Sequence, residues 1–154
     1  MRALIQRVKN ARVTVEGRET GSIGQGLLIF LGIRDTDSET ELRWMVKKCA
    51  ALRVFEDDDG KMNRSVRDIA GEALVVSQFT LYGNSKKGNR PSYIDAARPE
   101  FAEPMYERFC DALQIELGRD VATGEFGADM QVELTNDGPV TLWIERESTA
   151  SRPA

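Results

Sequence analysis

The sequence predicts an α+β domain in which an antiparallel β-barrel or rolled sheet packs against two amphipathic helices. Short apolar stretches rich in β-branched residues are separated by glycine-containing turns, which is typical of sheet strands. Two other segments repeat their apolar residues at helical spacing. Because the chain of 154 residues shows no repeat or linker, we expect one domain over residues 1–146. The small, polar segment 147–154 is expected to be a disordered tail.

The first third of the chain predicts four strands, at residues 2–8, 12–16, 20–23 and 27–33. Glycine-containing turns at 16–18 and 24–26 separate the later ones. Ser38 followed by Glu41 forms a capping-box pattern, and apolar residues at helical spacing then predict a helix to about residue 50. A further strand is expected over residues 52–55. The acidic run that follows, 57–59, lacks the ligand spacing of a calcium loop and predicts a turn.

The second half of the chain predicts a central strand, a helix and two final strands. Residues 73–82 form the apolar run of the central strand, and 83–92 form a glycine-rich, basic loop. Pro99 begins the second helix, and Gly118 ends it. Its expected apolar face consists of Phe101, Met105, Phe109, Ala112 and Leu113. The last strands are expected at 130–134 and 140–144, with the turn-forming residues 136–139 between them.

Composition excludes several classes of function. The chain contains no histidine, so a Ser-His-Asp triad or a Cys-His pair is impossible. Cys49 and Cys110 each lie on an apolar helix face, where cysteine usually acts as a small hydrophobe, and they predict no zinc site. No apolar stretch approaches the about 18 residues of a membrane span. The early charges of the N-terminus are unlike a secretory signal, so we expect a cytoplasmic protein.

The formal net charge of −4 argues against a general nucleic-acid binder, which would neutralise many phosphates. Positive charge is nevertheless concentrated at Lys47 and Lys48 and again at Lys86, Lys87 and Arg90. A single RNA end needs only a few such contacts. The alternative is that these cations are ordinary solvated surface charges.

Ser77, Gln78, Phe79 and Thr80 end the central apolar run, where a rigid strand meets solvent. Hydroxyl and amide groups at such a position suit catalysis or ligand binding. Alternatively, the two hydroxyls cap free backbone groups at the end of the strand.

Together with the segment Asn136-Asp-Gly-Pro-Val-Thr141, these four residues resemble the two signature motifs of the D-aminoacyl-tRNA deacylase family. The similarity extends through residues 2–8, 60–63, 90–93 and 126–130, and so covers nearly the whole chain. The resemblance implies the barrel-like fold with two helices. It also implies a homodimer that hydrolyses the ester of D-aminoacyl-tRNA, and of glycyl-tRNA mischarged on a non-cognate tRNA. It further implies that L-aminoacyl-tRNA is rejected, which would make the activity a chiral proofreading step in translation quality control.

The resemblance also assigns roles to residues. It implies that backbone N–H groups of Phe79 and Thr80 stabilise an oxyanion, with no metal or organic cofactor. Gly138 and Pro139 would be joined by a cis bond and would enter the site of the other subunit. Arg7 is a candidate partner for the Gly138-Pro139 carbonyls, and Phe126 and Met130 are candidate pocket walls. The candidate cations for binding the tRNA 3′ end are Lys86, Lys87 and Arg90.

Four interpretations of the chemistry remain open. Thr80 could be a nucleophile, although it has no adjacent base in the sequence. Alternatively, the ribose 2′-hydroxyl of the substrate could help to activate water. From a different class, the same scaffold could be a non-catalytic module that binds an RNA end or an aminoacyl ligand. A general esterase that uses Ser77 or Thr80 is the fourth possibility.

Overall fold

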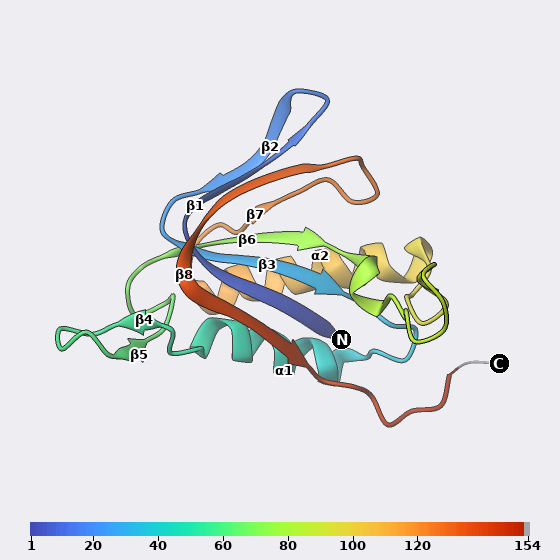
Figure 1. The fold of residues 1–154 in the computed structure, drawn as a ribbon. Coiled ribbons are helices and arrows are strands. Elements are labelled where there is room, and N and C mark those ends of the chain that lie inside the picture. Colours follow the sequence, from blue (N-terminus) through green and yellow to red (C-terminus); the bar gives the residue numbers. More distant parts are fainter. Residues whose placement is uncertain (153–154) are drawn as a thin grey trace.

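A computed structural model describes residues 1–152 and shows a curved, mixed sheet with two helices packed against one face (Figure 1). This arrangement confirms the expected α+β rolled sheet. The sheet strands are β1 (Arg2–Val15), β2 (Arg18–Ile23), β3 (Gly26–Gly32), β6 (Glu72–Ser77), β7 (Ala122–Thr123) and β8 (Gln131–Glu145). The last two residues of the expected tail, Pro153 and Ala154, lie outside the described part of the chain.

The strand order is β2-β1-β3-β6-β7, and β8 also pairs with β1. The pairs that involve β1 are antiparallel, as expected, whereas β3–β6 and β6–β7 are parallel. Parallel neighbours require long crossover connections, and the two helices supply them. The carboxyl ends of β3, β6 and β7 therefore lie at the same edge of the sheet.

The long strands β1 and β8 differ from the sequence prediction. Residues 2–8 and 12–16 were expected to be separate strands, and 136–139 was expected to be a turn between two more. Instead, β8 pairs with β1 along both of its halves, with register shifts near Arg7. Asn136 Nδ2 donates hydrogen bonds to the carbonyls of Arg7 and Val140, both at 3.0 Å. The turn-forming residues are thus absorbed as an irregularity within one strand, because the same partner strand continues past it.

Helix α1 (Glu39–Ala51) begins with the predicted capping box. Leu52 caps its other end, and its N–H bonds to the Lys48 carbonyl at 3.0 Å. The expected strand at 52–55 is therefore reduced to β4 (Phe55–Glu56), which forms a small hairpin with β5 (Met62–Arg64). Asp57 Oδ1 accepts the N–H groups of Asp59 and Lys61, at 2.9 and 3.0 Å, so the acidic run forms the predicted turn.

Helix α2 (Pro99–Leu117) ends at Gly118, which adopts a left-handed φ of 68°. Met105, Phe109 and Leu113 are buried as expected, but Phe101 is 38% exposed. The buried stripe reaches Ala102 instead, which lies seven residues, or two helical turns, before Phe109. No helix of residues 1–152 is long and apolar enough to cross a membrane.

Two apolar clusters occupy opposite faces of the sheet. Leu27, Ile29 and Leu31 face the helices, whereas Leu28 faces the other cluster, which the far half of β1 and part of β8 cover. Both cysteines are buried in the helix-side cluster, and burial raises the pKa of each thiol to about 12. Apolar packing therefore supports β6 on both faces of the sheet.

Candidate functional site

The four residues 77–80, called here the 77–80 turn, lie where β6 leaves the sheet. The strand ends at Ser77, and Phe79–Tyr82 form a short 3-10 helix rather than the expected continuation of the strand. The N–H of Gln78 still donates to the Leu31 carbonyl, at 2.8 Å. The neighbouring strand β3 ends one residue later, at Gly32, so β6 has no further partner on that side and the chain curls.

Two backbone donors of this turn point to a binding role. In a 3-10 helix the i→i+3 bonds leave the first N–H groups without a partner, and here those bonds begin with Leu81 N–H to Gln78 O, at 3.3 Å. Among the recorded hydrogen bonds of residues 1–152, none uses the N–H of Phe79 or Thr80. Two adjacent free donors at an exposed turn can donate hydrogen bonds to an oxygen that develops negative charge.

The side chains of the turn provide no general base. Gln78 Nε2 donates to the Thr80 hydroxyl, which is the hydrogen bond recorded for that hydroxyl. Phe79 is 56% exposed and packs edge-on against Tyr93, with ring centroids 5.2 Å apart. Tyr82, beneath the turn, is buried, and burial raises the pKa of its hydroxyl, so it stays protonated at neutral pH.

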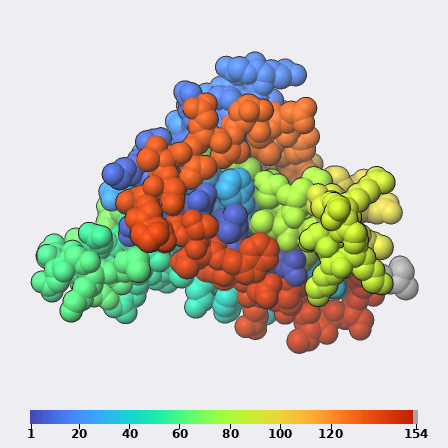
Figure 2. All heavy atoms as spheres, viewed as in Figure 1, coloured from blue at the N-terminus to red at the C-terminus, as the bar shows by residue number. Residues whose placement is uncertain are grey.

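A basic loop follows the turn directly. Asn84 and Ser92 pair through two backbone hydrogen bonds, of 2.8 and 2.9 Å, and close residues 84–92 into a projecting loop (Figure 2). The three cations Lys86, Lys87 and Arg90 are all exposed. The structure thus places them on one projecting loop beside the turn, which we call the basic loop.

Gly138 and Pro139 are joined by a cis peptide bond and are both exposed. Arg7 lies beneath them, 6% exposed. Its Nε donates to the carbonyl of Asp137 at 3.0 Å, and its Nη1 donates to the carbonyl of Val54 at 2.5 Å. Arg7 therefore fixes the residue that precedes Gly138, and its recorded bonds do not reach the carbonyls of Gly138 or Pro139.

Within one chain, the two motifs are far apart. Ser77 pairs with Leu31, and Leu31 pairs with Ala3, whereas the Gly138-Pro139 pair lies opposite Arg7. Four residues along β1 correspond to ~13 Å, and the strand spacings between β6 and β8 add ~14 Å across the sheet. A ligand bound at the 77–80 turn of an isolated chain would not contact Gly138-Pro139 of that chain.

The two candidate pocket walls lie against different clusters. Phe126 packs with the helix-side cluster, and its ring centroid is 5.9 Å from that of Tyr106. Met130 packs with the opposite cluster, near Gly124. Because β7 runs parallel to β6, Phe126 follows it toward the same sheet edge as Ser77. The structure therefore brings Phe126 toward the turn without showing a shared contact.

Sequence reasoning missed Arg2. Its Nη1 donates to the carbonyl of Leu81 at 3.0 Å, and its guanidinium lies over the rings of Tyr82 and Trp143, at 4.3 and 5.6 Å. Arg2 thus ties the start of β1 to the 3-10 helix. No local pattern indicates this contact, since the two residues are 79 positions apart. Among residues 1–152, no cluster of three or more Cys, Asp or Glu side chains is arranged to hold a metal ion.

Comparison with known proteins identifies relatives across nearly the full chain. Residues 4–145 match the family model described as D-Tyr-tRNA(Tyr) deacylase. The D-aminoacyl-tRNA deacylase of Salinibacter ruber is 56% identical over 148 residues, which are 96% of this chain and 99% of that protein. The D-aminoacyl-tRNA deacylase of Porphyromonas gingivalis is 57% identical over 145 residues, 94% of this chain and 97% of the relative.

Two solved structures share the fold. A c-Myc DNA unwinding element binding protein superposes with a TM-score of 0.89 at 44% identity, covering 96% of this chain and 100% of that one. A probable eukaryotic D-amino acid tRNA deacylase gives a TM-score of 0.81 at 17% identity, covering 93% and 97% of the two chains. The family model and these relatives each match almost the full length of the chain. The chain therefore belongs to the D-Tyr-tRNA(Tyr) deacylase family.

Proposed function

We propose that this chain hydrolyses the ester bond between a D-amino acid and the 3′-terminal ribose of tRNA. Its substrates include glycyl-tRNA mischarged on a non-cognate tRNA, and it leaves L-aminoacyl-tRNA intact. The observation that carries the proposal, beyond family membership, is the pair of free N–H groups at Phe79 and Thr80. The activity belongs to the cytoplasm, where it removes wrongly charged tRNA before translation.

The chemistry needs stabilisation of charge more than a strong nucleophile. An aminoacyl ester is already activated, and its hydrolysis passes through a tetrahedral oxyanion. A preorganised donor contributes about 3–4 kcal/mol to such an intermediate. The 77–80 turn supplies two donors on a backbone held by the sheet edge. Attack then requires only a positioned water molecule.

Thr80 acts through its backbone rather than its hydroxyl. A threonine nucleophile needs an adjacent base, and the recorded partner of Thr80 Oγ1 is the amide of Gln78. The substrate itself carries a 2′-hydroxyl beside the ester, which can help to activate water. A substrate ending in 2′-deoxyadenosine should therefore react far more slowly, whereas undiminished turnover would favour a general esterase.

The Gly138-Pro139 pair acts across the interface of a homodimer. The separation of the two motifs within one chain and the exposure of Gly138 and Pro139 support this arrangement. Carbonyl oxygens beside the substrate α-carbon exclude an L side chain by steric clash. They admit the α-hydrogen that takes this position in a D-aminoacyl ester, so selection works by rejection. D-amino acids of many sizes are then accepted, and glycine has no side chain to reject.

Mixing two variants tests the cross-subunit arrangement. Pro139→Ala should hydrolyse L-aminoacyl-tRNA, and Phe79→Pro should be nearly inactive because it lacks one oxyanion donor. In mixed dimers, the live site would combine the intact turn of one chain with the intact Gly138-Pro139 of the other. Excess Phe79→Pro protein should therefore restore rejection of the L substrate. Continued L hydrolysis would place the motif in the site of its own chain.

The basic loop holds the single-stranded 3′ end of the tRNA. Lys86, Lys87 and Arg90 are exposed on an arm that follows the 77–80 turn. A few local contacts are compatible with the net charge of −4, because binding then does not depend on a wide basic face.

A matched pair of substitutions tests the proposed function. Proline is tolerated at the first residue of a helix but has no N–H, so Phe79→Pro removes one donor, whereas Phe79→Leu keeps it. We expect Phe79→Pro to lower kcat by about 10²–10³-fold and Phe79→Leu to change it little. The assay measures free D-amino acid released from charged tRNA, with tRNA in large excess over enzyme. Release limited to one equivalent or less would identify a non-catalytic binding module instead.

A further inference from the structure

A second group of cations lies on α1, at a distance from the basic loop. A shallow groove of about 410 Å³ is lined by Trp44, Lys47, Lys48, Ala51, Leu52 and Arg53. Lys47, Lys48 and Arg53 are exposed, and Trp44 is half-buried. Figure 1 shows α1 along the lower side of the molecule, opposite the β1–β2 hairpin.

The charges of this groove are not neutralised. Among residues 1–152, ion pairs occupy many of the arginines, but none is recorded for Lys47, Lys48 or Arg146. Arg53 is bound to the carbonyl and side chain of Asn63, at 3.0 and 2.6 Å, rather than to a carboxylate. An acidic protein thus leaves several cations free on one face.

An aromatic ring lies among these cations. Lys48 Nζ is 5.2 Å from the centre of the Trp44 ring, and the Arg146 guanidinium is 5.6 Å from it. Free cations on an exposed surface contact the phosphates of a nucleic acid, and the half-buried Trp44 ring holds Lys48 and Arg146 on that surface. A second copy of the chain fits poorly. A two-fold contact would bring the same cations face to face.

The groove also lies next to the Gly138-Pro139 pair. Arg53 is followed by Val54, whose carbonyl accepts from Arg7, and Arg7 also binds the carbonyl of Asp137. Two short contacts therefore connect the groove with the residue before Gly138. An RNA whose 3′ end is held where that pair acts would extend from there over α1.

We propose that the α1 groove, with Arg146, binds the phosphate backbone of the double-stranded acceptor stem of the tRNA. This inference rests on the proposed function and adds a second contact to it. The basic loop holds the single-stranded end, and the α1 groove holds the duplex beyond it. The two contacts together distinguish a whole tRNA from a free aminoacyl ester.

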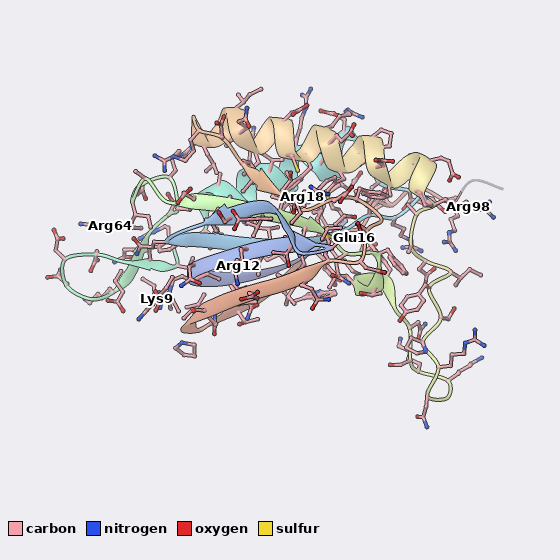
Figure 3. The ribbon with its side chains drawn as sticks, turned by 90° about the horizontal axis from the view of Figure 1, so that it is seen from above. Lys9, Arg12, Glu16, Arg18, Arg64 and Arg98 are labelled. Carbon is pink, nitrogen blue, oxygen red and sulfur yellow. The ribbon has the colours of Figure 1, made fainter. Side chains whose placement is uncertain are left out.

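Kinetics with two substrates test the proposal. The variant Lys47→Ala/Lys48→Ala is compared with Arg12→Ala/Arg18→Ala, which removes the same formal charge from exposed residues of β1 and β2 (Figure 3). With D-aminoacyl-tRNA, the lysine variant should raise KM about fivefold to tenfold. It should also make the negative slope of log(kcat/KM) against log salt shallower by about 2, one for each contact removed. The arginine variant should change neither quantity by more than about twofold.

The second substrate is a D-aminoacyl ester of adenosine, which has no stem. The lysine variant should hydrolyse it like the wild type. An equal loss with both substrates, or no loss with tRNA, would overturn the groove proposal. If the wild type hydrolyses neither substrate, the proposed function is overturned instead, so the two failures are distinguishable.

Direct binding gives an independent readout. The chain has two tryptophans, so in a Trp143→Phe background the fluorescence reports Trp44 alone. An uncharged RNA hairpin with the acceptor stem and 3′ end should change this emission, and the single-stranded 3′ end alone should not. Equal responses to both RNAs would overturn the proposal. A changed sedimentation coefficient of the lysine variant without RNA would do so too, because it would assign the groove to contact between copies.

Discussion

Gly32 controls the position of the 77–80 turn, and replacing it tests whether that position matters for catalysis. A Cβ atom at Gly32 would lie 3.1 Å from Leu81 Cβ and 3.2 Å from the Gln78 carbonyl oxygen. Ordinary contacts of this kind are about 3.5–4.0 Å, so the 3-10 helix must move by roughly 0.5 Å. Because a shift of about 1 Å can cost about 10²-fold, we expect Gly32→Ala to lower kcat about tenfold. Overpacking should also reduce the free energy of unfolding by about 1–3 kcal/mol.

Gly24→Ala is the matched control. Its added Cβ would approach only the end of the Glu72 side chain, at 3.4 Å, and that flexible chain can move aside. The assay combines single-turnover deacylation of D-aminoacyl-tRNA with thermal unfolding of both variants, at a temperature where each is folded. Wild-type kcat in folded Gly32→Ala protein would refute the claim that the turn must be held precisely. An equal loss of kcat in Gly24→Ala would refute the same claim.

Three further predictions concern the site and the buried thiols. Thr80→Val keeps both backbone donors, so deacylation should stay within about tenfold of wild type, or about 1.4 kcal/mol; a trapped acyl adduct on Thr80 would contradict this. Replacing the three cations of the basic loop by alanine should raise KM and flatten its salt dependence, with a smaller effect on kcat; an unchanged KM would show that the loop is only solvated surface. Burial raises the pKa of both Cys49 and Cys110 to about 12, so a disulfide reagent at pH 8 should label neither thiol until the protein unfolds; rapid labelling of the native protein would disprove their burial.

The sequence predicted those elements whose signals are local. The capping box at Ser38 and Glu41 uses neighbouring residues, and the structure confirms it. Gly118 likewise ends α2 where a left-handed residue is needed. The overall class followed from apolar periodicity, which records the face of each element that is buried.

The errors arose where pairing between residues distant in sequence decides the structure. Residues 136–139 are compatible with a hairpin turn and with an irregularity inside a strand, and only the continuation of β1 selects the latter. The apolar run of β6 continues through Leu81 and Tyr82, but β3 ends at Gly32, so the strand ends early. Strand direction was also missed, although the continuous apolar runs of β3 and β6 are typical of parallel strands that are buried on both faces.

The candidate site was predicted in part for the same reason. The 77–80 turn and Gly138-Pro139 were recognised as contiguous motifs. The contact of Arg2 with Leu81, the packing of Tyr93 on Phe79 and the bonds of Arg7 to Val54 join positions remote in sequence. Single-sequence patterns carry no information about such contacts.

We propose that this chain removes D-amino acids from tRNA and leaves their L counterparts intact. The most direct test compares initial rates of deacylation of one tRNA charged with a D-amino acid, with the same amino acid in its L form, and with glycine, under multiple-turnover conditions. We expect efficient release of the D-amino acid and of glycine, with L release no faster than spontaneous hydrolysis. Efficient release of the L-amino acid, or no release above background from any of the three substrates, would contradict the claim.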